Sequence, residues 1–159
     1  MEDKDLREAK KLYLQAYDLN PRLVQALYNT GLVQMRRGKV NSAMVYFRWV
    51  LQKKPRHSRA YNNLAVCLSR QGKISEAIEH YERAIRYNRT FADAYVNLAI
   101  LLVKCGDHLA AYKNFRYFLE QAGAEDPDRE AARELMKSIS RSFNSPSRIN
   151  LRSRRATAI

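Results

Sequence analysis

The sequence predicts an all-α fold, a right-handed superhelical solenoid of stacked antiparallel helix pairs. The main observation is a repeat, because Gly38, Gly72 and Gly106 recur every 34 residues. The surrounding residues recur as well, since AYNNLA at 60–65 returns as AYVNLA at 94–99. A period of this length indicates one helical hairpin that stacks on its neighbours to bury a continuous core. The chain has only five glycines and four prolines, which also favours helix.

Each full repeat is expected to hold two helices. The three full repeats are placed at residues 24–57, 58–91 and 92–125. In the middle repeat, the first helix carries apolar side chains at the i, i+3, i+4, i+7 spacing of one helix face. The residues that form this face are Tyr61, Leu64, Ala65 and Leu68. Each repeat glycine stands where the first helix should end, and glycine readily takes the left-handed conformation that ends a helix.

The pattern extends backwards to a partial repeat, and one more helix is expected after the last full repeat, so we assign residues 1–143 to one repeat domain. Residues 3–19 match the second helix of an earlier repeat whose first helix is missing. This suggests a fragment of a longer repeat protein; the alternative is a native start at which the lone helix caps the stack. Residues 127–143 should form an amphipathic capping helix. Residues 144–159 are basic and rich in Ser and Arg, and we expect them to be disordered.

The pattern resembles the tetratricopeptide repeat, whose two antiparallel helices carry a signature of large, small and glycine positions. Residues 58–91 fill every signature position but the last, where Arg89 stands in place of proline. The departures in the other two repeats are Thr30, Gln34, Phe118 and Gly123. The resemblance implies a non-enzymatic scaffold that binds a peptide or helix of a partner protein in its concave groove.

The resemblance also implies which side chains line this groove, namely those at set positions of the first helix in each repeat. One position is asparagine throughout, at Asn29, Asn63 and Asn97. An amide both donates and accepts, so this row could bind a peptide backbone; alternatively, each asparagine could bond only to a neighbouring helix. Apolar residues at another position could hold a hydrophobic segment or pack against the next helix. The candidate groove residues are Tyr28, Asn29, Leu32, Met35, Arg59, Asn62, Asn63, Val66, Asn97 and Ile100.

Some members of this family bind chaperone C-terminal tails through a carboxylate clamp of Lys, Arg and Asn side chains. The matching positions here hold Tyr28, Leu32, Asn63, Asp93 and Asn97. Only Asn63 fits, so the sequence disfavours this mode of binding.

Charge is distributed unevenly along the chain, whose formal net charge is +13. Residues 19–75 contain eleven basic residues and no acidic residue. Stacking would align the turns within the repeats into a basic ridge, which we define as Arg36, Arg37, Lys39, Arg70, Lys73 and Lys104. Residues 53–59 form a second basic cluster. These charges favour an acidic partner protein. The alternatives are an anionic membrane surface, nucleic acid, or a basic surface that is merely solvated.

Other features argue against catalysis and metal binding. His57, His80 and His108 have no neighbours at catalytic or metal-ligand spacing, so we expect no metal site, cofactor or enzymatic activity. The alternative is the recognition domain of a larger enzyme. Cys67 and Cys105 lack a CxxC context and are expected to be free thiols, buried or half-buried.

The N-terminus has neither the basic start nor the apolar stretch of a signal peptide. The longest apolar run, residues 98–103, is too short to span a bilayer. We therefore expect a cytoplasmic protein. The incomplete first repeat could also pair with another copy of the chain.

Overall fold

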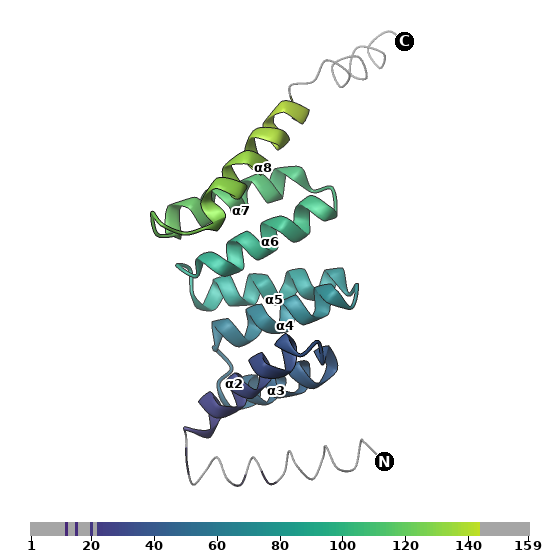
Figure 1. The fold of residues 1–159 in the computed structure, drawn as a ribbon, viewed down its shortest axis with the longest axis vertical. Coiled ribbons are helices and arrows are strands. Elements are labelled where there is room, and N and C mark those ends of the chain that lie inside the picture. Colours follow the sequence, from purple (N-terminus) through teal and green to yellow (C-terminus); the bar gives the residue numbers. More distant parts are fainter. Residues whose placement is uncertain (1–11, 13–14, 16–19, 21, 144–159) are drawn as a thin grey trace, which may run out of the picture. The chain divides into compact units, whose positions relative to one another are not determined.

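A computed structural model describes residues 12, 15, 20 and 22–143 of the chain. The expected helix at 3–19 lies mostly outside the described residues, and the expected tail at 144–159 lies entirely outside them. Every regular element in the described part is a helix, which confirms the all-α, helical-repeat fold class (Figure 1). The helices are α2 (Leu23–Arg36), α3 (Val40–Lys53), α4 (Ser58–Arg70), α5 (Ile74–Tyr87), α6 (Ala92–Lys104), α7 (His108–Gln121) and α8 (Asp128–Phe143).

The repeat glycines end the first helix of each pair, as predicted. Gly38, Gly72 and Gly106 have φ angles of 74°, 75° and 80°, in the left-handed region. In the first of these turns the amide of Lys39 bonds to the carbonyl of Gln34, and the amide of Gly38 bonds to that of Met35. The other two turns repeat this pattern. This pair of hydrogen bonds is the Schellman motif, and it satisfies carbonyl groups that the end of a helix leaves without partners.

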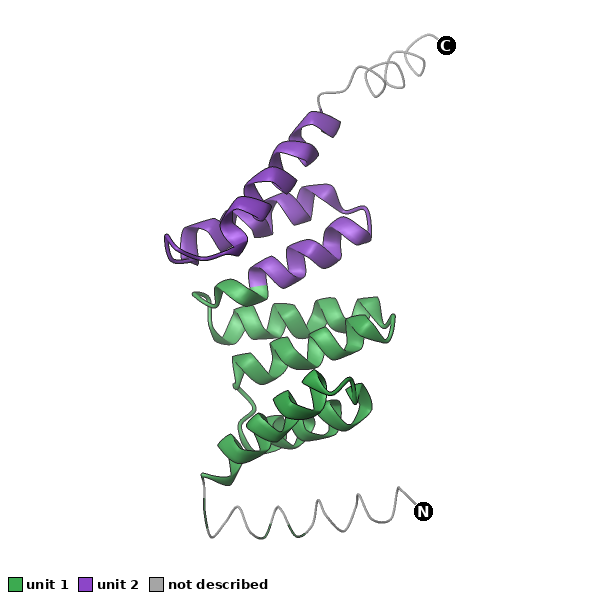
Figure 2. Cartoon of the chain, viewed as in Figure 1, with its two compact units in different colours: residues 1–94 green, residues 95–159 purple. Residues whose placement is uncertain are grey.

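The chain divides into two compact units, residues 1–94 and residues 95–159 (Figure 2). The first unit contains α2 to α5, in which α2 packs on α3, α3 on α4, and α4 on α5. Its core includes the fully buried side chains of Phe47, Val50, Leu64 and Leu68. Small residues allow the close approach of paired helices. At Gly31, for example, a Cβ atom would stand only 2.7 Å from the ring of Phe47.

In the second unit, α8 packs against α7. Phe115 and Phe118 of α7 are fully buried, and Ala132 and Ile139 are the buried residues of α8. The carboxylate of Asp126 accepts a hydrogen bond of 3.0 Å from the amide of Asp128, so it caps the start of α8 as an N-terminal aspartate should.

The prediction for the cysteines is correct in part. Both are free thiols, and Cys67 is buried within α4, but Cys105 is exposed. Cys105 follows the last residue of α6 and lies in the turn, so its side chain is outside the helix face that packs in the core. The described residues include no helix that is both long and apolar enough to cross a membrane.

Candidate functional site: the α2–α4 face

A hydrogen bond connects the first helices of two consecutive repeats. The side-chain nitrogen Nδ2 of Asn63, on α4, donates to the hydroxyl of Tyr28, on α2, over 2.9 Å. Nδ2 of the adjacent Asn62 donates a longer bond of 3.4 Å to Oδ1 of Asn63. The predicted groove positions of α2 and α4 therefore meet in space. The asparagine also does what the second interpretation expected, because it bonds to a neighbouring helix.

Two of the predicted groove residues lie beneath this surface. The side chain of Tyr28 is 8% exposed and that of Asn62 is 5% exposed. The ring of Tyr28 packs near Phe47 and His57, with ring centres 5.9 and 5.1 Å away. These contacts hold the tyrosine in place. Tyr28 and Asn62 thus support the surface, and a ligand would meet other side chains.

The side chains that reach solvent come from the same helices. Asn29 and Arg59 are exposed, while Leu32, Met35 and Val66 are half-buried. On α2, Asn29, Leu32 and Met35 follow one another at a spacing of three, and Leu32 is four positions after Tyr28. On α4, Arg59 is four positions before Asn63 and Val66 is three positions after it. These spacings place the residues on the same side of each helix as the bonded residues Tyr28 and Asn63. We call this surface the α2–α4 face. It combines an apolar floor with an exposed amide and a guanidinium group. Oδ1 of Asn29 accepts a bond of 3.0 Å from Gln25, one turn earlier on α2.

Charged groups of both signs lie near the hydroxyl of Tyr28 and affect its pKa. Burial raises the pKa of Tyr28, whereas the bond from Asn63 and the positive charge of Arg59 lower it. The carboxylate of Asp93 raises the pKa of Tyr28 slightly, so one acidic group stands near this face. Otherwise the described residues from Arg22 to Ser75 carry only basic charges. The face is therefore mainly positive.

Five residues of the basic ridge belong to the first unit, and all five are exposed. The side chain of Gln71 donates a hydrogen bond to Asn41, which joins the turn before α5 to the start of α3. This bond places the turns of the first two full repeats side by side, as stacking requires. Lys73 is 4.0 Å from Glu76, which offsets part of its charge. The sixth residue, Lys104, is exposed in the second unit.

The other two candidate groove residues, Asn97 and Ile100, lie on α6 in the second unit. Asn97 is half-buried, and Ile100 is 39% exposed. Among the described residues no cluster of His, Cys, Asp or Glu side chains could hold a metal ion.

His57 has a structural role that the sequence pattern did not predict. Its Nδ1 atom accepts a hydrogen bond of 3.1 Å from the amide of Ala60 and so caps the start of α4. Burial, with smaller effects of Lys54 and Arg59, lowers the pKa of His57, which keeps the ring neutral and able to accept. An open depression of about 510 Å³ lies beside it, lined by Lys54, Pro55, Arg56 and His57. Histidine is an uncommon cap, so the sequence held no clear signal for this role.

Comparison with known proteins supports the repeat pattern. Three family models, each described as a tetratricopeptide repeat, match residues 1–48, 58–91 and 80–113. No curated protein sequence matches the chain.

Several solved structures have a similar fold. One is the first such domain of Spaghetti (RPAP3) bound to the HSP90 peptide SRMEEVD, with 20% identity, a TM-score of 0.68, and coverage of 77% of this chain and 94% of that one. Another is the Yersinia enterocolitica secretion chaperone SycD with a peptide of the translocator YopD, with 18% identity, a TM-score of 0.71, and coverage of 76% and 95%. A third is the TPR2B domain of yeast Sti1 in a complex with pHsp70, with 16% identity, a TM-score of 0.69, and coverage of 75% and 97%. At these identities the likeness shows the fold.

Proposed function

Because the chain belongs to the tetratricopeptide repeat family, we propose that it is a non-enzymatic scaffold that binds a partner protein through the α2–α4 face. The ligand is an acidic peptide or helix with apolar side chains. The observation that carries this proposal is the bond between Tyr28 and Asn63. This bond connects α2 and α4, the first helices of two consecutive repeats, so that their exposed polar and half-buried apolar residues lie on one surface.

The composition of the face supports an acidic, partly apolar ligand. Leu32, Met35 and Val66 offer half-buried apolar surface, which suits an amphipathic segment. Arg59 is exposed and can form a two-pronged contact with a carboxylate. The solved complex of the Spaghetti domain contains a peptide with three acidic residues, SRMEEVD, which is consistent with an acidic ligand for this fold.

The mode of contact differs from a carboxylate clamp. Tyr28 and Leu32 stand at two clamp positions, and Tyr28 is buried. Asn63 donates one N–H to Tyr28 and its oxygen accepts a longer bond from Asn62, so part of its hydrogen-bonding capacity is already used within the protein. We therefore assign the main contacts to Asn29, Arg59 and the apolar floor.

The two free thiols are consistent with the reducing cytoplasm, where we place the protein.

Peptide selection on the full chain tests this function. A random peptide library displayed on phage is selected against the wild-type protein, and the recovered peptides are measured by fluorescence anisotropy. We expect enrichment of Asp and Glu next to apolar residues. Arg59→Glu should weaken the binding of these peptides by roughly tenfold, which corresponds to 1.4 kcal/mol. Arg86→Glu, which changes an exposed arginine of α5, is the matched control and should leave binding unchanged.

Salt separates this function from a purely electrostatic one. Binding to an apolar face should retain much of its affinity as salt rises, whereas docking on anionic lipid or nucleic acid should lose most of it. Peptides without acidic enrichment, or equal binding to wild type and Arg59→Glu, would contradict the proposal. So would stronger binding to anionic vesicles or to single-stranded RNA than to any selected peptide.

A further inference from the structure

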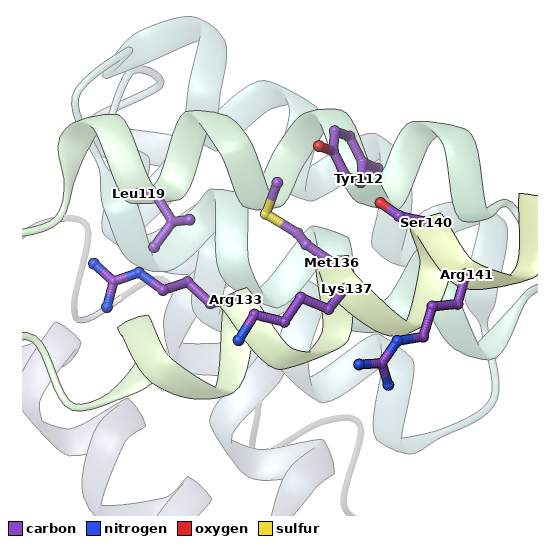
Figure 3. A pocket seen from close by; sticks show the side chains of 7 residues that line it. All are labelled: Tyr112, Leu119, Arg133, Met136, Lys137, Ser140 and Arg141. Carbon is purple, nitrogen blue, oxygen red and sulfur yellow. The ribbon is translucent and has the colours of Figure 1, made fainter. Parts of the chain in front are cut away.

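A second surface, separate from the α2–α4 face, lies between α7 and α8. It is a cavity of about 460 Å³ within the second unit (Figure 3). Tyr112 and Leu119 of α7 and Met136 of α8 form its apolar part, and all three are half-buried. Figure 3 shows Met136 between the two helices and the basic side chains along α8. These basic residues are Arg133, Lys137 and Arg141.

The residues at the equivalent positions of an earlier repeat can be compared with the residues that line the cavity. Two periods earlier in the sequence, the positions of Tyr112, Leu119 and Met136 are held by Met44, Leu51 and Leu68. Met44 and Leu68 are only 4% and 1% exposed. The partly buried Leu51 packs against a cluster that includes Ala84 of α5.

In the first unit, α5, the second helix of the next repeat, packs on α4, and the equivalent side chains of α3 and α4 are buried or partly buried there. In the second unit, α8 stands in the place of a first helix and is the last described element. The cavity is the seat for a further second helix. Its half-buried apolar lining is what such a helix would cover.

The charges of this seat differ from those of its counterpart. The positions equivalent to Arg133 and Lys137 are Ala65 and Ser69, so α8 carries two extra positive charges where a helix would lie. Because these residues and Arg141 follow a spacing of four, they form a row along one side of α8. Arg133 is 3.3 Å from Glu130, and Lys137 is 2.6 Å from Glu134. These pairs are exposed and weak, and neither glutamate lines the cavity.

We propose that the α7–α8 cavity docks an acidic amphipathic helix from a partner protein, which completes the stack in the place of a further second helix. The apolar stripe of that helix covers Tyr112, Leu119 and Met136. Its acidic residues pair with Arg133, Lys137 and Arg141. Residues 144–159 of this chain contain four arginines and no acidic residue, so like charges oppose their docking here.

The test uses the full chain and a synthetic helical peptide with Leu on one face and Glu on both flanks. The control peptide carries Lys in place of each Glu. Fluorescence anisotropy should show binding of the acidic peptide and at least roughly tenfold weaker binding of the basic peptide. The double variant Arg133→Glu, Lys137→Glu and the single variant Met136→Gln should each weaken binding of the acidic peptide.

Three matched measurements keep the result specific. The double variant Arg86→Glu, Lys113→Glu reverses two exposed charges outside the cavity and should bind normally. Arg59→Glu should leave the peptide-induced NMR shift of the Met136 methyl group unchanged, which separates binding at this cavity from binding at the α2–α4 face. Circular dichroism verifies that each variant retains its helix content. If Met136→Gln binds as wild type does, or if both peptides bind equally, the proposal is wrong.

Two further measurements on the full chain test whether the cavity is filled by residues 144–159 or by a second copy of the chain. In methyl NMR spectra of the free full chain, the methyl group of Met136 should show no contacts to residues 144–159. Such contacts would show that the chain covers its own cavity and would overturn the proposal. Self-association in sedimentation experiments that Lys137→Glu abolishes would point to a second copy as the occupant and would also overturn it.

Discussion

The side-chain amide of Asn63 donates a hydrogen bond to the hydroxyl of Tyr28 and so connects α4 to α2 across two consecutive repeats. Asn63 is half-buried and Tyr28 is buried, so the loss of either partner leaves a polar group poorly satisfied. Tyr28→Phe should therefore lower the free energy of unfolding by about 1 kcal/mol in urea denaturation. Tyr46→Phe, at a half-buried tyrosine of α3, is the control and should have a smaller effect.

A double-mutant cycle separates this bond from other effects of the substitutions. We expect a coupling free energy of about 0.5–1.5 kcal/mol between Tyr28→Phe and Asn63→Ala. Additive effects of the two substitutions would show that the bond contributes nothing to stability. In that case Asn63 would be available for a ligand, as the first interpretation of the asparagine row, binding of a peptide backbone, holds.

Gly31 is required by close packing against Phe47. Alanine favours helix over glycine by about 1 kcal/mol, so Gly31→Ala should stabilise α2 if space allowed. A Cβ atom here would stand 2.7 Å from the fully buried ring of Phe47, which Tyr28 also contacts. Overpacking of a core costs typically 1–3 kcal/mol, so we expect net destabilisation in thermal unfolding. Gly123→Ala, in open space, should change stability little, and a stabilising Gly31→Ala would contradict this account.

His57 should make the stability of the first unit depend on pH. Its folded pKa is lower than the usual 6.5, mainly because of burial, so the folded protein holds fewer protons on this ring than the unfolded chain does. The stabilisation is therefore complete above about pH 6.5 and is lost as the pH falls from there through the folded pKa. Protonation also removes the acceptor that caps α4.

His57→Asn offers the matched variant, because asparagine caps a helix and does not titrate in this range. Between pH 8 and pH 5, the free energy of unfolding of the wild type should fall more than that of His57→Asn. Urea denaturation at several pH values measures this difference. Parallel pH profiles would rule out a lowered pKa at His57.

Arg129 holds α8 on α7. Its Nη1 atom donates to the carbonyl oxygens of Leu119 and Ala122, each over 2.9 Å. A positive charge at the end of α7 also suits the helix dipole. Arg129→Gln should cost about 1–3 kcal/mol, seen as faster hydrogen exchange of the α8 amides. Arg133→Gln breaks only an exposed pair with Glu130 and should change exchange little. Equal protection in both variants would argue against this role.

The repeat period predicted the helices well because stacking imposes one pattern on every unit. The left-handed turns at Gly38, Gly72 and Gly106 followed from that pattern alone. The bond between Asn63 and Tyr28 did not, because the period gives the position of an asparagine and leaves its partner open. Likewise, Asn62 was expected in the groove and is buried, since its exposure depends on how neighbouring helices pack.

The cap at His57 and the α7–α8 cavity could not be predicted from the sequence alone. The first depends on a ring nitrogen that points back to the helix it precedes. The second depends on which residues stay half-buried at the last described helix. The sequence nevertheless held a signal for the cavity, because Arg133 and Lys137 replace the small residues found two periods earlier.

The most direct test of the central claim is chemical-shift mapping of a selected acidic peptide on the isotope-labelled full chain. The account predicts that the largest shift changes fall on Asn29, Leu32, Arg59 and Val66, and that Arg59→Glu reduces them. Changes confined to Tyr112, Met136 and their neighbours, or changes that Arg59→Glu leaves intact, would contradict the claim that the α2–α4 face is the peptide-binding site.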